Sequence, residues 1–363
     1  MRPLKEELRD RRLPELMMTQ RGEPVVSSLL WEKRRAELLK IMAREEFGFS
    51  PEPVPASGRV ADGSIKEAYG GKAVEKRFVV TFPTPKGDFS FPLYLAIPSA
   101  GQPCPCILLL NFRKQIPDEY YPVEEILDAG FATACIYYQD ITSDDGNMED
   151  GLAGCFSLSQ AGETGMGKIG CWAYAMSRAV DLLLEQPEIR KNAIVTAGHS
   201  RLGKTSLWCA AQDQRIAGCI SNNAGCSGDA ITRGKAGEHV VDITTHFPFW
   251  FATSYQRYRE REEDMPFDQH FLLAAIAPRP LAVGAAQEDE WADPVSQMLG
   301  CMAAAPAWRL LGREAFAEPY EMLRPGYALQ NGWIGFHIRS GGHFFSRWDW
   351  KQYLAFFAKR FDM

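Results

Sequence analysis

Ser200 is the residue of this chain whose surroundings best suit covalent chemistry. It stands between Gly198 and Gly203, in a segment that also holds two positive charges, Arg201 and Lys204. Small residues let a serine occupy a strained turn without clashing with the elements on either side. A serine hydroxyl is a weak nucleophile at neutral pH, so this chemistry also needs a histidine base and a carboxylate that orients it.

The segments around Ser200 complete a recognisable motif. Residues 193–195 are an apolar run that predicts a short buried strand, and residues 205–212 predict a helix. A strand, a sharp turn and a helix form a nucleophile elbow, which exposes the serine Oγ and aims the next N–H, that of Arg201, at a developing oxyanion. The second glycine usually follows the serine by two residues, whereas Gly203 follows Ser200 by three.

His343 is the predicted base among six histidines. It follows Ser340-Gly341-Gly342, after the last expected strand and before the C-terminal helix, where this architecture delivers a histidine over its serine. His199 adjoins the serine and is expected to pack away from it. His337 alternates within a strand pattern and reads as a structural histidine.

The orienting acid is expected after the strand at 281–286. Its outlet carries four carboxylates, and Asp289 is favoured because the strand passes into the loop there. Glu288, Glu290 and Asp293 remain alternatives, since a cluster of charges is often only a solvated loop.

The elements that must position these residues alternate between strand and helix. Strands are predicted at 106–111, 131–137, 193–198, 216–222, 281–286 and 334–339, and helices at 121–129, 168–186, 203–213 and 296–312. This pattern predicts an α/β fold, a mostly parallel twisted sheet with helices on both faces. A hairpin is expected at 76–83 and 90–98.

We expect one domain over residues 1–363, with 1–75 as an N-terminal extension. Residues 1–50 are predicted helical, and 51–75, rich in proline and glycine, are predicted irregular. The stretch from Asp140 to Lys168 is too long for a plain connection and is predicted to cover the rim of the site.

Composition excludes several classes of protein. A net charge of −6 argues against nucleic-acid binding, and nine scattered cysteines form no metal-ligand spacing, so neither a metal nor a cofactor is expected. The sequence shows no signal core and no apolar run long enough to span a membrane, which predicts no membrane partner and a cytoplasmic location. A secreted or periplasmic location would require a leader already removed.

The chain resembles the glucuronoyl esterases of carbohydrate esterase family 15, in their bacterial branch. The resemblance runs from about residue 165 to the end and rests on an ordered series of motifs: GHSRLGK at 198–204, SNNAGCSG at 221–228, GE at 237–238, FPFWF at 247–251, PFDQH at 266–270, APRP at 277–280, DEWADP at 289–294 and GH at 342–343. It implies the α/β-hydrolase fold, a three-layer sandwich, and metal-free hydrolysis of esters between 4-O-methylglucuronate on xylan and alcohols of lignin.

The resemblance also implies roles for individual residues. Ser200 would be the nucleophile, His343 the base and Arg201 an oxyanion residue. Lys204 would meet sugar hydroxyls or the uronate, and Glu238 and Trp291 would lie against the sugar. Fungal members place their acid after the strand that follows the elbow; Asn223-Ala224-Gly225 stands there in this chain, and an asparagine cannot serve, which again favours Asp289.

The predicted function is therefore that of a serine carboxylic-ester hydrolase acting on glucuronoyl esters of small or oligomeric carbohydrates. An acetyl esterase of xylan or oligosaccharides, or a general carboxylesterase, with the same triad is the alternative. A binding protein that kept the fold is disfavoured because the catalytic set is intact.

Overall fold

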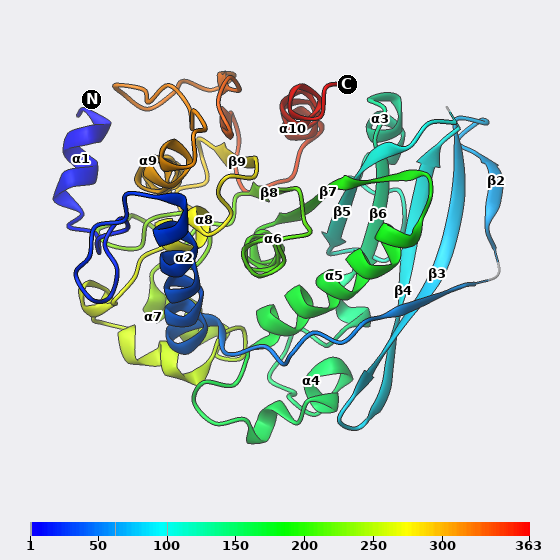
Figure 1. The fold of residues 1–363 in the computed structure, drawn as a ribbon, viewed down its shortest axis with the longest axis horizontal. Coiled ribbons are helices and arrows are strands. Elements are labelled where there is room, and N and C mark those ends of the chain that lie inside the picture. Colours follow the sequence, from blue (N-terminus) through cyan, green and yellow to red (C-terminus); the bar gives the residue numbers. More distant parts are fainter. Residues whose placement is uncertain (1, 62, 100) are drawn as a thin grey trace.

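One twisted sheet of eleven strands organises the protein, whose computed structural model describes residues 2–61, 63–99 and 101–363 (Figure 1). The strand order is β1-β3-β4-β6-β5-β7-β8-β9-β11-β10, with β2 beside β3. The strands are β1 (Ser57–Val60), β2 (Ile65–Ala68), β3 (Ala73–Thr84), β4 (Gly87–Pro98), β5 (Cys104–Asn111), β6 (Ala132–Tyr137), β7 (Ile189–His199), β8 (Gly218–Asn222), β9 (Leu281–Ala286), β10 (Ala328–Leu329) and β11 (Ile334–Arg339).

The middle of the sheet is parallel and its edges are antiparallel. Strands β6, β5, β7, β8, β9 and β11 pair in parallel, one after another. At one edge β1, β2, β3 and β4 add antiparallel pairs, and at the other β10 does so. The parallel centre and the β3–β4 hairpin were both predicted, and the arrangement is that of an α/β-hydrolase.

Helices cover both faces of this sheet (Figure 1). The α-helices are α1 (Leu4–Asp10), α2 (Ser28–Met42), α3 (Val123–Asp128), α4 (Gly151–Cys155), α5 (Lys168–Glu185), α6 (Arg201–Gln212), α7 (Val240–His246), α8 (His270–Ala274), α9 (Pro294–Leu310) and α10 (Arg347–Arg360). Shorter helical turns are η1 (Ala43–Phe47), η2 (Tyr138–Asp140), η3 (Leu158–Gln160), η4 (Thr253–Tyr258) and η5 (Glu262–Asp264).

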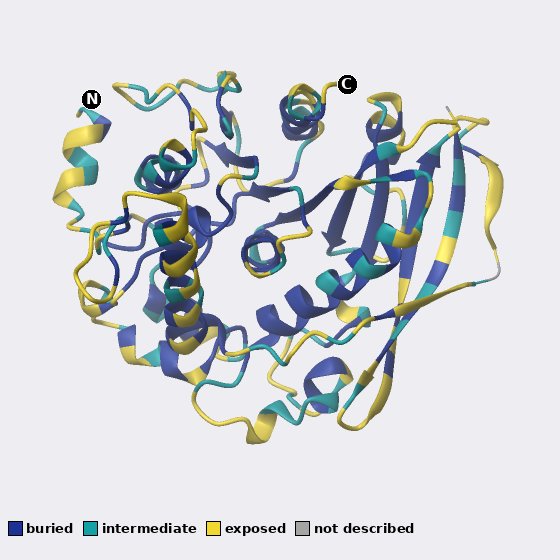
Figure 2. Ribbon diagram, in the orientation of Figure 1, coloured by how far each residue is buried: buried dark blue, intermediate teal, exposed yellow. Residues whose placement is uncertain are grey.

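The central strands are buried on both sides because their residues alternate between two apolar layers. In β5, Cys106, Leu108 and Leu110 face the layer that contains α5 and α6, whereas Ile107 and Leu109 face the one that contains α3 and α10. Strands covered on both faces therefore appear dark blue in Figure 2, while α1 and β2 are largely exposed.

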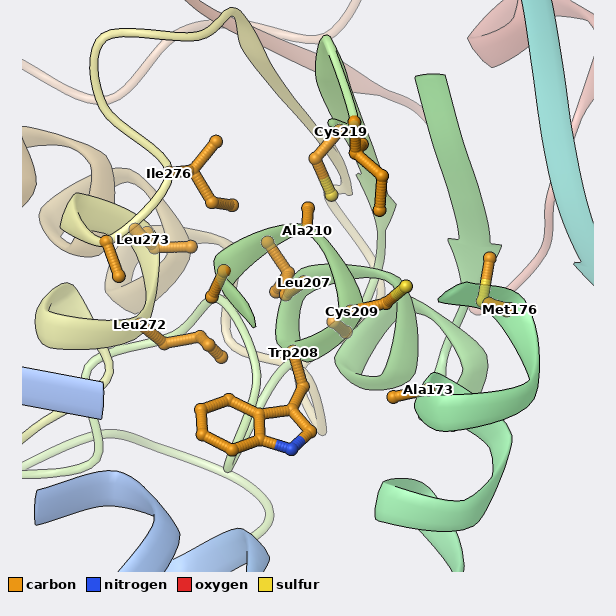
Figure 3. Close-up of a cluster of buried hydrophobic side chains, with 14 of the residues drawn as sticks. Ala173, Met176, Leu207, Trp208, Cys209, Ala210, Cys219, Leu272, Leu273 and Ile276 are labelled. Carbon is orange, nitrogen blue, oxygen red and sulfur yellow. The ribbon is translucent and has the colours of Figure 1, made fainter. Parts of the chain in front are cut away.

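Helix α6, which begins directly after Ser200, sits in the larger of these layers. Leu207, Trp208, Cys209 and Ala210 pack against residues of α5, α8 and β8 (Figure 3). Trp208 is fully buried and its ring stacks on Phe47 at a centroid distance of 4.5 Å. The packing holds the helix, and with it the start of the helix, in a fixed position against the sheet.

The N-terminal extension differs from its prediction in two ways. Residues 11–27 are not helical: only α1, α2 and η1 are, and the helical spacing used for the whole stretch belongs to α2. Residues 51–75 are not all irregular, because β1 and β2 pair with β3, which itself begins at Ala73. These strands were missed because they are short and mostly exposed, so no alternation of apolar residues marks them.

Candidate active site

Ser200 occupies the sharp turn between β7 and α6 with φ 58° and ψ −129°, a conformation that non-glycine residues seldom adopt. Its N–H donates to the carbonyl of Asn222, 2.9 Å away at the end of β8. A Cβ at Gly198 would lie 2.0 Å from the carbonyl oxygen of Leu202, and one at Gly203 would lie 3.1 Å from the Cβ of Ala224. The turn therefore requires glycine at position 198 and leaves little room for a side chain at position 203.

His343 contacts Asp289. The Nδ1–H of His343 donates to Asp289 Oδ2 at 2.7 Å, so that in the neutral ring Nε2 carries the lone pair that can take a proton from a hydroxyl. Burial tends to raise the pKa of Asp289, but the hydrogen bonds from His343 and Asn223 outweigh it and hold the pKa below its usual value. Asp289 is thus a buried, charged partner for the histidine.

The other three carboxylates of this loop are engaged elsewhere or face solvent. Glu288 accepts from the N–H of Gly341 at 3.2 Å, and Glu290 is exposed. Asp293 caps the start of α9 through Ser296. Of the four candidates, the structure brings Asp289 to His343.

His199 lies beneath His343, with ring centroids 4.5 Å apart. Burial and the neighbouring His343 lower the pKa of His199 to about 3, so it is neutral at physiological pH. Its Nδ1–H donates to Asn222 Oδ1 at 2.7 Å, and the amide of Asn222 donates in turn to Tyr353 at 3.1 Å. His199 is therefore packed, as predicted. Its ring contact holds His343 against the end of β7, directly before Ser200.

Ser200 and His343 are further connected through the loop after β8. Asn223 has φ 48°, and its side-chain amide donates to Asp289 at 2.6 Å. The carbonyl of Asn222, the residue before it, accepts the hydrogen bond from the Ser200 N–H. No hydrogen bond between Ser200 Oγ and His343 is found within the described residues. In free enzymes such bonds are often long and shorten only around a bound substrate.

Arg201 opens α6, so its N–H has no partner inside the helix and lies at the positive end of the helix dipole. Its guanidinium lies between three aromatic rings, closest to Trp250 at 4.5 Å from the ring centroid, and it forms an ion pair with Asp144. A backbone donor and a cation next to Ser200 are the groups that stabilise a negatively charged oxygen.

Lys204, Glu238 and Trp291 lie together, although they are far apart in the sequence. Lys204 Nζ is 3.8 Å from the Glu238 carboxylate and also donates to the carbonyl of Ala224. The N–H of Glu238 donates to the carbonyl of Trp291 at 3.0 Å. Lys204 is buried rather than at the mouth of the pocket, whereas the Trp291 side chain is 53% exposed.

Four further residues, Lys235, Asn223, Asp144 and Glu46, lie at this site, and their contacts there were not predicted from the sequence. Lys235 donates to the carbonyls of Glu238 and Trp291, at 2.7 and 3.3 Å, and so joins the two segments. Burial raises the pKa of Glu46 well above its usual range, even though Gln269 donates to it and Lys204 is near. Apart from the bond of Lys235 to Glu238, these contacts join segments that are remote from each other in the sequence, so no local pattern could reveal them.

The stretch from Asp140 to Lys168 borders this site, as its contact with Arg201 shows. It is partly ordered by α4 and η3. The fully buried Lys168, at the start of α5, donates to the carbonyl and the hydroxyl of Ser143, both at 2.8 Å. These bonds hold the loop at Ser143.

A cavity of about 500 Å³ opens beside Trp291. Its lining includes Gly237, Glu290 and Trp291 on one side and the 322–325 segment on the other. In the part of the chain that the structure describes, no group of three or more His, Cys, Asp or Glu side chains could hold a metal ion. None of the described helices combines the length and apolar character needed to cross a membrane.

Comparison with known proteins agrees with this geometry. The family model described as "Glucuronyl esterase, fungi" matches residues 80–312. Among curated proteins, Carbohydrate esterase MZ0003 from an unknown prokaryotic organism is 29% identical, over 95% of this chain and 88% of that protein. The 4-O-methyl-glucuronoyl methylesterase of Schizophyllum commune is 26% identical, over 81% of this chain and 72% of its own length.

Solved structures show the same relationship. The glucuronoyl esterase from Solibacter usitatus superposes with a TM-score of 0.86 at 34% identity, covering 95% of this chain and 97% of that one. A promiscuous CE15 esterase from a marine bacterial metagenome superposes with a TM-score of 0.85 at 29% identity, covering 95% and 96%.

Proposed function

Because the chain belongs to the glucuronyl esterase family, we propose that it hydrolyses esters between the carboxyl group of 4-O-methylglucuronate and an alcohol. The observation that carries this proposal is the set of contacts around the elbow: a strained Ser200, a His343 oriented by Asp289, and a lysine–glutamate pair nearby. The first three residues perform ester hydrolysis in general, and the pair suits the hydroxyl groups of a sugar.

The reaction has two halves. Ser200 Oγ attacks the ester carbonyl carbon while its proton passes to His343 Nε2, and the resulting oxyanion is stabilised by the N–H and guanidinium of Arg201. The carbon–oxygen bond to the alcohol then breaks, and the alcohol takes the proton from His343. Water attacks the acyl-enzyme in the same manner, which releases the uronic acid and restores Ser200. Asp289 keeps His343 in the required tautomer throughout.

The sugar is proposed to lie against Lys204, Glu238 and Trp291. A buried lysine and a carboxylate 3.8 Å apart can donate to and accept from adjacent hydroxyl groups, and the exposed indole offers an apolar face to the ring. We also propose that the substrate is an oligosaccharide that carries the uronate ester, and that its further sugar units extend past Trp291 toward the neighbouring cavity.

Lys204 separates a uronate esterase from an acetyl esterase. Lys204→Met keeps most of the side-chain volume and should lower kcat/KM for benzyl glucuronate about ten- to a hundredfold, since a charge-assisted hydrogen bond is worth roughly 1.5–3 kcal/mol. Benzyl acetate, which has no sugar hydroxyls, should lose little. Measured rates that fall equally for both esters would contradict the proposed sugar site, and faster hydrolysis of acetylated xylo-oligosaccharide than of benzyl glucuronate would favour an acetyl esterase.

A further inference from the structure

The guanidinium of Arg201 is held by one carboxylate from a distant part of the chain. Its Nη1 donates to Asp144 Oδ2, 57 residues earlier, and its carbon lies 4.5 Å from the centroid of Trp250 and 5.3 Å from that of Phe247. A planar group stacked on rings and bound at one nitrogen has little freedom to rotate.

Asp144 is itself fixed by three donors. Its Oδ2 accepts from Arg201 and from the hydroxyl of Tyr138 at 3.0 Å, and its Oδ1 accepts from the indole N–H of Trp250 at 2.7 Å. The carboxylate is 6% exposed. Ser143, the residue before it, is bonded to the buried Lys168, so the backbone on this side is held as well.

The N–H groups on Nε and Nη2 of Arg201 donate no hydrogen bond among the described residues, because only Nη1 is engaged, by Asp144. Nε is also buried. A buried donor without a partner is uncommon in folded proteins and is stabilised when an acceptor arrives. Arg201 follows Ser200 directly, so this guanidinium belongs to the residue next to the one at which the oxyanion forms during ester hydrolysis.

We propose that Asp144 is a positioning residue for catalysis: it fixes the Arg201 guanidinium so that its charge and its unpaired N–H groups are held beside Ser200, where the oxyanion forms. This inference rests on the proposed function only in that an ester is hydrolysed at Ser200. An oxyanion forms whichever acyl group the substrate carries, so the effect of Asp144 should appear on uronate and acetyl esters alike.

Asp144→Asn tests the proposal because it keeps the shape of the side chain and removes the charge. The loss of a whole oxyanion donor lowers kcat by about 10²–10³. Asp144→Asn leaves the donor in place but less well fixed, so we expect a smaller fall in kcat, about ten- to a hundredfold, with KM changed by less than about threefold. Asp145→Asn is the matched control: this neighbouring carboxylate belongs to the same loop and pairs with Lys168 rather than Arg201, and kcat should stay within about twofold.

A double-mutant cycle distinguishes positioning from general support of the fold. If Asp144 acts through Arg201, the double variant Asp144→Asn/Arg201→Gln should be about as slow as Arg201→Gln alone. Tyr138→Phe removes one donor to Asp144 and serves if Asp144→Asn does not fold; its kcat should fall about two- to fivefold.

Several results would overturn the proposal. They are an unchanged kcat in a folded Asp144→Asn or Tyr138→Phe variant, a loss that appears in KM alone, or losses in Asp144→Asn and Arg201→Gln that add in full. The cycle is run on whichever ester the wild type hydrolyses, so a failure of the uronate assignment, seen in the wild type's own substrate preference, remains distinct from a failure of this inference.

Discussion

Asp289 and its three neighbours show how a single contact selects one residue from a group that looks alike in sequence. All four are carboxylates within six positions, but the hydrogen bond to His343 involves Asp289, and Asn223 donates to the same oxygen. Its position after the strand favoured Asp289 in the sequence. The hydrogen bond from Asn223 could not be predicted, because the fold brings these two residues together from distant parts of the chain.

Replacing this acid should have an effect that replacing its neighbour does not. Asp289→Asn should lower kcat about 10⁴-fold, because an amide in place of the carboxylate stabilises the wrong tautomer of His343. Glu290→Gln should change kcat little, since Glu290 is exposed. Steady-state kinetics of both variants on one ester decide the matter, and the reverse ranking would move the role of the acid to Glu290.

The strands and helices that carry the site residues were predicted correctly where the periodicity of apolar residues in the sequence matches their burial in the fold. β9 and β11 have the predicted bounds, and α5, α6 and α9 begin within about two residues of theirs. The β1, β2 and β10 strands were not predicted, because pairing with neighbours rather than their own sequence defines them. The Asp144–Arg201 pair could not be predicted for a similar reason: it joins a loop to a helix start far along the chain.

The strand–turn–helix unit around Ser200 should tolerate almost no added bulk at its first glycine. In Gly198→Ala the new methyl group would lie 2.0 Å from the carbonyl of Leu202, so the turn must open. We expect a loss of more than about 3 kcal/mol in the free energy of unfolding, together with loss of activity. Gly203→Ala, whose nearest contact is 3.1 Å, should be milder. Denaturant unfolding of both variants tests this prediction. A Gly198→Ala variant as stable as the wild type would contradict the tight turn.

At the scale of the whole molecule, the N-terminal segment packs against the layer of helices that contains α6 and α8. Arg35 in α2 is buried and donates to the carbonyls of Ala211 and Ala275, beside α6 and α8. His270 donates its Nε2–H to the carbonyl of Pro14 at 3.0 Å. The helical spacing of α2 was visible in the sequence, but the surface that receives it was not.

His270 makes the stability of this assembly depend on pH. Burial lowers the pKa of His270 to about 4, from 6.5 in an exposed histidine, so between these values the unfolded chain binds a proton that the folded chain does not. Stability is therefore complete above pH 6.5 and is lost as the pH falls toward 4, by about 2 kcal/mol at pH 5.

Thermal or denaturant unfolding at pH 7 and pH 5 measures this effect. His270→Gln should reduce the difference in stability between the two pH values, whereas His246→Gln, at an exposed position, should leave it unchanged. A difference that persists in His270→Gln at its full wild-type size would contradict a role for this buried imidazole.

Hydrolysis of benzyl glucuronate by the wild type and by Ser200→Ala is the most direct test of uronate ester hydrolysis at Ser200. We expect the wild type to release benzyl alcohol. The rate of the folded Ser200→Ala variant should fall by at least about 10³-fold, because only substrate binding and the oxyanion donors remain. A variant that keeps more than a few per cent of the wild-type rate, or a wild type that leaves this ester intact, would contradict uronate ester hydrolysis at Ser200.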